Sequence, residues 1–307
     1  MRHLFFFSIF LFNFQFSHSQ NPSHFELHLT KGDSFNVEII EASDTEQLVM
    51  GEEQKIKKTD SYSFLLSLDS LPTDSSYYFR ATYKHFKSVF DRDDYSEVFD
   101  TDSISNTLNP EISFFRSLIG KSFFFEIDKT GNVLKFENLE NIFRSSSIIE
   151  LNQRSGVMLQ KKYGSECIQN TVFSLKFPEE KKLQVNNWLI ADTAYSGILK
   201  ICDRSVIVTE ETDSICNTTI KANILTDPNI HIKTNNVYIV YNMAGKQSGT
   251  VDLYRRSCFL KQSYQKQYIS GSAGMKYSVN SGLAYTWPIK ITNTITCKVT
   301  KINSHEE

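Results

Sequence analysis

Residues 122–136 read SFFFEIDKTGNVLKF, two short strand-like runs around a tight turn. Apolar side chains recur at every second position from 123 to 127, which is the period of a strand with one buried face. Residues 128–132 are types that favour turns, and Gly131 can adopt a positive φ without steric cost. Residues 133–136 then return as the partner strand. The segment predicts an antiparallel β-hairpin.

Similar patterns appear on both sides of that hairpin. Residues 25–29 and 35–39 alternate around a turn at residues 31–33, which read KGD. The 24 Phe and 14 Tyr residues of the 307-residue chain also favour strands over helices. The further strands that we expect are residues 62–68, 77–86, 188–191, 197–202, 206–209, 218–225, 237–241, 250–254, 259–264 and 292–301.

The middle of the chain has a different period. Apolar residues in 139–152 and 157–172 show no strand alternation, and Pro178 bounds the second stretch. We therefore expect two helices there. The predicted fold class is α+β and strand-dominated, with curved antiparallel sheets and two helices between two halves.

The two halves show a faint internal similarity. Residues 127–135 of the first half correspond to residues 253–261 of the second, in the same order along the chain. We expect one β-rich domain over residues 20–303, with related halves at about 24–136 and 180–301 joined by a helical segment at 137–177. Chance similarity between strand-rich stretches is the alternative.

The N-terminus has the pattern of a cleavable export signal. A basic start precedes an apolar core at residues 4–12, and Ser17 and Ser19 are small enough for cleavage before Gln20. The alternative is a buried N-terminal strand. The apolar run is shorter than the roughly 20 residues that a membrane-spanning helix needs. A lipoprotein signal needs a cysteine directly after the apolar stretch, and the first cysteine is Cys167. We therefore predict a signal peptide at residues 1–19 and an exported protein, periplasmic or extracellular and not lipid-anchored.

The charge of the chain excludes one class of partner. The net charge is −2 and no basic stripe is present, so nucleic acid is not expected as a partner. No later apolar run reaches membrane-spanning length, so we expect no transmembrane segment.

All five cysteines lie in the second half of the chain. An exported protein can form disulfides, but an odd number leaves at least one thiol unpaired or bonded to another chain. Two bridges among five cysteines have 15 arrangements, which the sequence does not distinguish. Several cysteines acting as small buried hydrophobic residues is the alternative. The five are Cys167, Cys202, Cys216, Cys258 and Cys297.

Recognisable catalytic and cofactor motifs do not occur. The sequence contains no G-x-S-x-G, no H-E-x-x-H and no glycine-rich phosphate loop, and residues 271–274 form only a glycine-rich turn. His24 and His28 share one face of a strand, but no third ligand accompanies them, so exposed histidines are the favoured interpretation. We assign no catalytic, cofactor-binding or metal-ligating residue.

An acidic stretch at residues 91–102 is the best cation candidate. A calcium-binding EF-hand loop would need a glycine where Ser96 stands and a glutamate where Asp102 stands. We therefore expect a flexible, solvated loop with weak or no calcium binding. Its carboxylates are Asp91, Asp93, Asp94, Glu97, Asp100 and Asp102.

Aromatic residues recur at strand spacing and have two interpretations. They could line a cavity for an apolar ligand, but such residues more often fill the core, which is the interpretation that we favour. The set is Phe25, Phe35, Phe64, Phe79, Tyr83, Phe123, Phe125, Tyr238 and Tyr241.

Two of these segments carry a family resemblance. The KGD turn at 31–33, and residues 120–133, which read GKSFFFEIDKTGNV, resemble the KG start and the central signature (G-x-x-F followed by D-x-x-G-x-V) of an uncharacterised family of exported bacterial envelope proteins. The resemblance supports the architecture and implies no catalytic residues. Many members are lipoproteins, and this chain departs from them in lacking the signal cysteine.

These observations favour a non-enzymatic exported protein with a binding or envelope-structural role. A curved sheet closed by helices could hold an apolar ligand, and the partner is then that ligand or another envelope protein. The alternative is an enzyme of unrecognised type that acts on cell-envelope polymers. An enzyme should show a cleft with converging carboxylates or a Ser/His/Asp set, whereas a carrier should show an apolar cavity.

Overall fold

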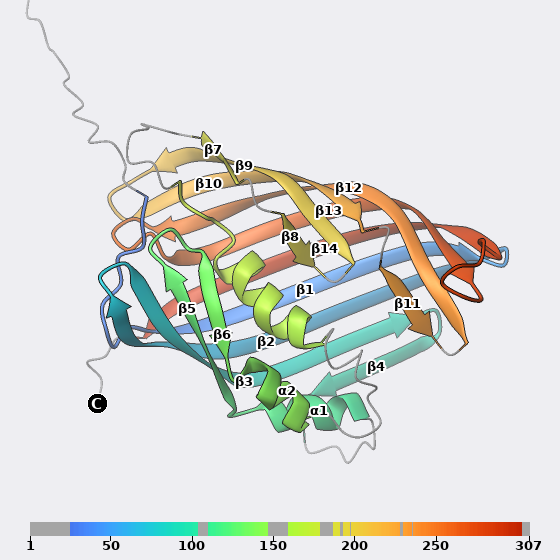
Figure 1. The fold of residues 1–307 in the computed structure, drawn as a ribbon, viewed down its shortest axis with the longest axis horizontal. Coiled ribbons are helices and arrows are strands. Elements are labelled where there is room, and N and C mark those ends of the chain that lie inside the picture. The colour runs from blue at the N-terminus through green and yellow to red at the C-terminus, as the bar shows by residue number, and fades with distance from the viewer. Residues whose placement is uncertain are drawn as a thin grey trace, which may run out of the picture.

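The fold is one large antiparallel sheet with a few short helices (Figure 1). It is taken from a computed structural model. The structure describes residues 25–103, 110–146, 159–178, 187–190, 193–196, 198–227, 230–234 and 236–302. The predicted signal peptide lies outside the described residues.

The strands of the two halves are separated in sequence by most of the helices. The first-half strands are β1 (Ser34–Val49), β2 (Glu52–Thr73), β3 (Ser76–Arg92), β4 (Tyr95–Asp100), β5 (Ser122–Asp128) and β6 (Val133–Glu137). The second-half strands are β7 (Asn187–Ile190), β8 (Ala194–Ser196), β9 (Leu199–Glu211), β10 (Ile215–Thr226), β11 (His231–Thr234), β12 (Val237–Tyr254), β13 (Leu260–Lys276) and β14 (Tyr285–Ile302). The helices are α1 (Pro110–Leu118), α2 (Leu139–Ser146), η1 (Lys161–Ser165) and η2 (Ile168–Val172).

The two halves meet in the middle of the sheet. The strand order is β6-β5-β3-β2-β1-β14-β13-β12-β10-β9-β7, with β4, β8 and β11 paired to β3, β9 and β12. Each half is a meander of neighbouring strands, and β1 pairs antiparallel with β14 from Ser34–Ile302 to Gln47–Ile289. Duplication of two related halves stays a prediction, and the two meanders belong to one sheet rather than to two.

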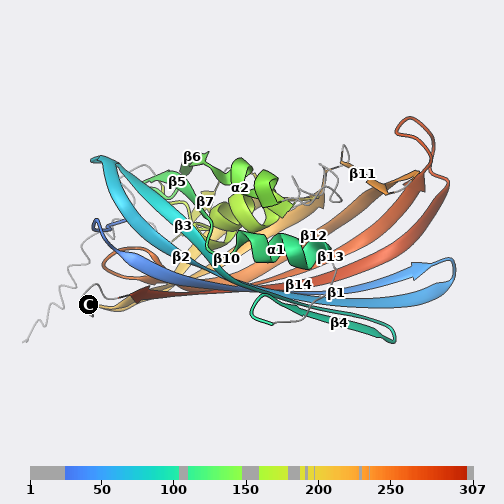
Figure 2. The same cartoon turned by 90° about the horizontal axis from the view of Figure 1, so that it is seen from below.

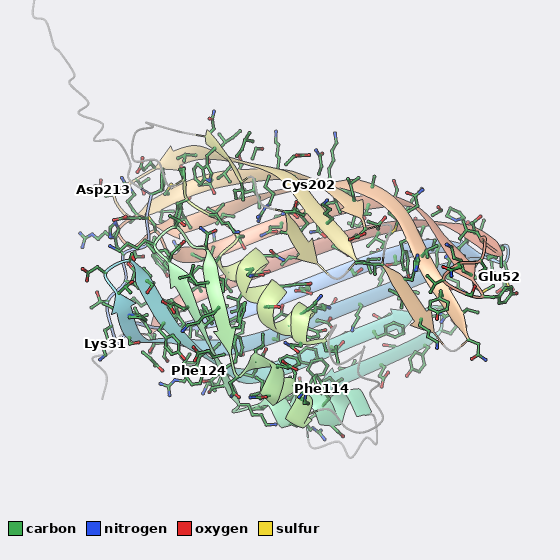
Figure 3. The ribbon with its side chains drawn as sticks, viewed as in Figure 1. Lys31, Glu52, Phe114, Phe124, Cys202 and Asp213 are labelled. Atoms are coloured by element: carbon green, nitrogen blue, oxygen red, sulfur yellow. The ribbon has the colours of Figure 1, made fainter. Side chains whose placement is uncertain are left out.

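The sheet is strongly curved and carries its helices on the concave side (Figure 2). We call the end with the turns near Lys31 and Asp213 the proximal end, and the end near Glu52 the distal end (Figure 3). The N-terminal stretch binds two turns at the proximal end: Leu27 N–H donates to Lys129 O at 2.8 Å and His28 N–H donates to Ser257 O at 2.9 Å.

The core at the proximal end is aromatic and lies between sheet and helices. Phe79 is fully buried, with its ring centroid 5.3 Å from that of Phe125 and 6.0 Å from that of Phe173. Phe114 of α1, labelled in Figure 3, is also fully buried and lies 5.7 Å from Phe143 of α2. The seven predicted aromatic residues from Phe25 to Phe125 all belong to this proximal cluster, so they fill the core. Tyr238 and Tyr241 are half-buried on β12 instead.

The hairpin and the two helices predicted from the sequence are present. Strands β5 and β6 pair around a turn in which Gly131 has φ of 87°. Helix α2 begins at Leu139 as expected, and helical structure extends through residues 159–172. Helix α1 was not predicted, although Pro110 at its first position is a typical helix start.

The prediction that the acidic residues 91–102 form a flexible loop is wrong. Residues 91–102 lie largely in a β-hairpin of β3 and β4, with a tight turn at Asp93 and Asp94, where Asp93 has φ of 49°. Aspartate tolerates this left-handed conformation better than most residues, so a turn forms without the glycine that we looked for. Weak or absent calcium binding stays a prediction.

Two predicted pairs of strands are single long strands. Residues 197–202 and 206–209 belong mainly to β9, which continues through a positive φ of 52° at Asp203. Residues 237–241 and 250–254 are the two ends of β12. Apart from Met243 and Ala244, the residues between them are polar or glycine, which hid the alternation.

Two glycines of that hidden segment allow β12 and β13 to approach closely. A Cβ on Gly245 would lie 2.1 Å from Tyr268 O, and one on Gly249 would lie 2.2 Å from Tyr264 O. A larger residue at either position would push the neighbouring backbone away. Such glycines are a known means of curving a sheet.

Candidate functional site

A belt of polar side chains crosses the concave face of the sheet between two apolar clusters. The register puts Asp60 opposite both Ser88 and Glu41, and Gln267 opposite both Gln247 and Asn293. Toward the proximal end lies the aromatic core, and toward the distal end lies a smaller aliphatic cluster. We call this set the polar belt: Ser88, Asp60, Glu41, Gln265, Gln267, Gln247 and Asn293.

Amide side chains form a hydrogen-bonded ladder in the belt. Asn293 Nδ2 donates to Gln267 Oε1 at 3.1 Å, and Gln267 Nε2 donates to Gln247 Oε1 at 2.9 Å. Gln247 Nε2 in turn donates to Gln265 Oε1 at 2.9 Å. The three glutamines are buried. The ladder therefore ends on Gln265, whose oxygen accepts a bond within it.

Charged side chains attach the helix η1 to the other half of the belt. Lys162 Nζ lies 2.7 Å from Asp60 Oδ2 and 3.3 Å from Glu41 Oε2. Tyr163 also donates its hydroxyl to Asp60 at 2.8 Å, and Ser88 donates to the other carboxylate oxygen at 2.7 Å. Asp60 is only 1% exposed, so its carboxylate is stabilised by partners rather than by bulk water.

This network sets the ionisation of its members. Burial alone would raise the pKa of Asp60, but the charges of Lys162 and Lys58, with hydrogen bonds from Lys162 and Ser88, hold that pKa below its usual value. Burial would lower the pKa of Lys162, yet Tyr163, Glu41 and Asp60 raise it well above its usual value. Both groups are therefore charged at neutral pH.

A cavity lies between the helical segment and the belt. The sheet contributes Glu41, Gln247, Gln265 and Gln267 to its lining, and the helical side contributes residues from Lys162 to Ser174. Its volume is about 40 Å³, which holds roughly three water molecules. The remaining lining is largely aliphatic: Ile190, Ile201, Val206, Ile220, Ala222 and Ile295.

Two buried polar atoms of this lining have no partner among the described residues. They are Gln265 Nε2 and Ser174 Oγ, on residues that are 3% and 5% exposed. A buried donor without an acceptor costs about 1–3 kcal/mol. The site therefore contains hydrogen-bonding capacity that the described protein does not use.

The helical segment over the cavity has an unusual geometry. Both η1 and η2 are π-helical, a conformation that is rare and frequent at functional sites. Together with the two α-helical residues between them, they supply Glu166, Cys167, Asn170 and Thr171 to the lining.

The cavity borders the distal apolar cluster through shared residues. Ile201 and Ala222 belong both to the cavity lining and to the distal cluster. The buried members of the distal cluster are Ala194, Leu199, Ile201, Ala222, Ile224, Met243, Ile269, Ala273 and Ile289. A molecule in the cavity would therefore contact amides on one side and aliphatic side chains on the other.

The residues singled out from the sequence lie elsewhere. His24 is outside the described residues, and the exposed His28 lies 3.6 Å from Glu26. Of the acidic stretch, Asp100 and Asp102 lie 2.9 Å and 3.6 Å from His85 Nε2. These three residues could offer one ligand atom each to a metal ion, but Asp100 already pairs with Lys87 at 3.5 Å.

All five cysteines are free thiols, and four are buried. Cys202, labelled in Figure 3, lies half-buried on β9. Burial raises the pKa of Cys216 to about 12 and that of Cys167 well above its usual value, so these thiols are poor nucleophiles. The structure thus contains no disulfide among the described cysteines, and the small-hydrophobe interpretation describes four of the five.

Sequence reasoning missed the polar belt, although a signal for it existed. Phe35, Val37 and Ile39 alternate inward on β1, and the next inward position in the same phase is Glu41. In the same way, Asp60 continues the inward phase of Tyr62 and Phe64 on β2. A polar residue in an inward phase has to find a partner, and this is what identifies the belt.

Comparison with known protein families identifies the family of the chain. A family of unknown function, DUF6263, matches residues 74–260, which is more than half of the sequence. The chain belongs to this family. That region of the DUF6263 protein runs from β3 to β12 and includes α1, α2, η1 and η2. Strands β1, β2 and β14 lie outside it, as does β13 apart from Leu260.

Solved structures and curated proteins add little to the family assignment. No curated protein matches the DUF6263 chain. A lipovitellin structure, described for its lipid–protein interactions, is 8% identical with a TM-score of 0.49 and is covered to 26%, so the DUF6263 chain spans about a quarter of its length. The match covers 91% of the DUF6263 chain.

Two other solved structures are less similar. An outer membrane channel from Pseudomonas putida F1 has a TM-score of 0.22 at 9% identity, with 91% of this chain and 99% of that chain covered. A DUF1329 family protein from Desulfovibrio piger has a TM-score of 0.14 at 7% identity, with 91% and 88% covered. All three TM-scores are below 0.5, and we base no conclusion on them. Within the described residues, no helix is both long and apolar enough to cross a membrane.

Proposed function

We propose that this DUF6263 protein is an exported binding protein that holds a largely apolar ligand on the concave face of its sheet, beneath η1 and η2. The observation that carries the proposal is the cavity between helix and belt, which joins unpaired buried polar atoms to the distal aliphatic cluster. Ligand pockets combine apolar surface with placed polar groups. This lining also combines the two, although its polar and charged residues outnumber its aliphatic ones.

Binding is favoured over catalysis by the state of the reactive groups. The carboxylates of Asp60 and Glu41 converge at the site, but both are held by Lys162 and by tyrosine hydroxyls. A general acid or base needs a pKa near the working pH, whereas the partners of Asp60 move its pKa further from neutrality. The buried Cys167 thiol has a raised pKa and is unsuited to nucleophilic attack.

A ligand of ordinary size requires movement of the helical segment. Sites for drug-sized molecules occupy about 300–1,000 Å³, whereas the present cavity has about 40 Å³. Lys162 and Tyr163 attach the π-helical segment to the belt, and Ile168 and Val172 pack in the proximal core, so enlarging the space requires the segment to shift over that core. The proposed ligand-bound state is one in which η1 and η2 have moved outward.

The sequence pattern at residues 1–20 supports the export that we propose, to the periplasm or to the outside of the cell. An apolar molecule in either aqueous compartment needs a protein to shield it from water, because exposing apolar surface costs about 25 cal/mol per Å². The proposed location and the proposed ligand are therefore consistent with each other.

The proposal is tested by titrating the purified full chain with N-phenyl-1-naphthylamine, an uncharged apolar dye whose fluorescence rises in apolar surroundings. Solvent extraction and mass spectrometry of protein from the native host would identify co-purified molecules. We expect saturable dye binding, weakened at least tenfold in Ala222→Leu, which fills the cavity lining. Asn223→Leu, on the opposite face of the same strand, is the matched control and should bind as the wild type does. Absence of both dye binding and co-purified ligand would contradict the proposal.

A further inference from the structure

The glutamine ladder has a direction, and this direction determines what its end can bind. Each amide from Asn293 onward donates an N–H to the oxygen of the next amide, and the last oxygen is that of Gln265. Gln265 Nε2 then has no acceptor among the described residues, on a side chain that is 97% buried and lines the cavity. The missing partner is a hydrogen-bond acceptor.

The charge of the lining argues against an anion as that acceptor. Lys162, Arg204 and Lys221 are its basic residues, and Glu41 and Glu166 are its acidic residues. Lys162 is already neutralised by Asp60 and Glu41, which lie 2.7 Å and 3.3 Å from its Nζ, and Lys221 is exposed to water. These cations give little attraction for a buried anion, whose desolvation would be costly.

The size of the cavity and its surroundings narrow the acceptor further. The present volume, enough for roughly three water molecules, already accommodates a carbonyl group beside Gln265, whereas the rest of a ligand needs the outward movement of η1 and η2. Ser174 Oγ, the second unpaired atom, lines the same space and can also donate a hydrogen bond. The aliphatic residues Ile201 and Ala222 extend from there into the distal cluster.

We propose that the ligand is an ester- or amide-linked acyl chain, whose carbonyl oxygen accepts a hydrogen bond from Gln265 and whose hydrocarbon part lies against Ile201 and Ala222. This inference rests on the proposed function and specifies the ligand class of the same site. It implies that the protein distinguishes ligands with a carbonyl group from ligands without one, and does not select a ligand by its charge. A site built to donate a hydrogen bond rejects an analogue without the acceptor, because its buried donor is then left unpaired.

The test compares two ligands that differ only at the carbonyl. 1-Monolauroylglycerol carries an ester, and 1-O-dodecylglycerol has the same head and chain length with an ether in its place. Each displaces N-phenyl-1-naphthylamine from the wild-type full chain, and we expect the ester to bind about tenfold more tightly. With a ¹³C-labelled ester, isotope-edited infrared spectra of the complex should show the carbonyl stretch shifted to lower frequency than in an apolar solvent, where it has no hydrogen-bond donor.

Variants show which residues cause the preference for the ester over the ether. Gln265→Leu should bind ester and ether equally, Ser174→Ala should reduce the preference, and Gln262→Leu, an exposed position on the same strand, should retain it. Equal binding of the two ligands by the wild type, or an unshifted carbonyl stretch, overturns the inference and leaves the proposed function in place. Binding of neither lipid nor dye contradicts the proposed function itself. The wild-type comparison does not depend on the folding of any variant.

Discussion

The two apolar clusters on the concave face differ although the same sheet supports both. The proximal cluster is rich in aromatic side chains from β1, β2, β3 and β5 and is covered by α1, α2 and the π-helical segment. The distal cluster consists mainly of smaller aliphatic residues from β9, β10 and β12–β14. The polar belt separates the two.

This difference indicates a division of roles along the strands. Aromatic residues bury 150–250 Å² each and dominate the energy of a core, so the proximal end provides most of the stability. The distal end and the belt are then free to differ in sequence for binding. Each of the following predictions tests that division, from the largest expected effect to the smallest.

Replacement of a proximal aromatic residue should have the largest effect. Phe79→Ala removes a fully buried ring that contacts Phe125, Phe173 and Phe259, and should lower the free energy of unfolding by about 4 kcal/mol. Ile289→Ala in the distal cluster should cost about 2 kcal/mol. Urea denaturation measures both, and equal costs would contradict the division of roles.

Removal of the Lys162 cation at the belt should have the second-largest effect on the free energy of unfolding. Lys162→Met leaves the Asp60 carboxylate buried with Lys58, 3.4 Å away, as its remaining basic partner. Breaking a buried pair in this way costs on the order of 3 kcal/mol. The double variant Lys162→Met/Asp60→Asn should recover part of that loss, and a purely additive result would show that the two groups do not interact.

The glycine contacts should give a smaller loss. Gly249→Ala places a methyl group against Tyr264 O and should cost about 2 kcal/mol through local separation of β12 from β13. Gly282→Ala is the matched control, since nothing lies within 4 Å of its Cβ position. Thermal unfolding that shifts equally in both variants would show that the close approach is unimportant for the sheet.

The pH dependence should be the smallest effect. Because the pKa of Asp60 is lowered in the folded state, its contribution is present above the unfolded pKa of about 3.9 and is lost as the pH falls through the lower folded value. Lys162 has a raised pKa, so its contribution is present below about pH 10.4 and is lost as the pH rises through the higher folded value. Asp60→Asn should flatten the acid limb of stability in urea titrations at about pH 2 to 5, which spans the unfolded pKa and lower values. An unchanged limb would assign it to other carboxylates.

The sequence predicts the strands that pack on the aromatic core at the proximal end well. It predicts the strand segments nearer the distal end poorly. The alternation around Gly131 and the inward phase of Phe35 to Ile39 predict strands because burial is on one face only. The same criterion failed on β12, where Gly245, Gln247 and Gly249 occupy the concave phase, and the strand was divided in two. Apolar periodicity detects a strand only where that strand packs against an apolar core.

The candidate site was beyond the sequence for a related reason. The polar belt contains residues from β1, β2, β3, β12, β13 and β14, and only the register of those strands brings Glu41, Asp60 and Gln265 to adjoining rows. Inward polar positions could be identified one strand at a time, but their partners could not. The partner Lys162 comes from a π-helical segment that no periodicity in the chain specifies.

The pairing of β1 with β14 has a consequence for the order in which the protein assembles. The other neighbouring strands pair with segments much closer in sequence, the widest separation being that of β3 and β5 across β4 and α1, so each meander can form through shorter loop closures. The β1–β14 ladder brings together the two ends of the chain and carries a far larger loop entropy. We therefore expect the middle of the sheet to be completed last during folding, after both arms have formed. In the exported chain that we propose, β1 is translocated before the other strands of the sheet. The edge of β1 that pairs with β14 would then remain unpaired until β14 arrives.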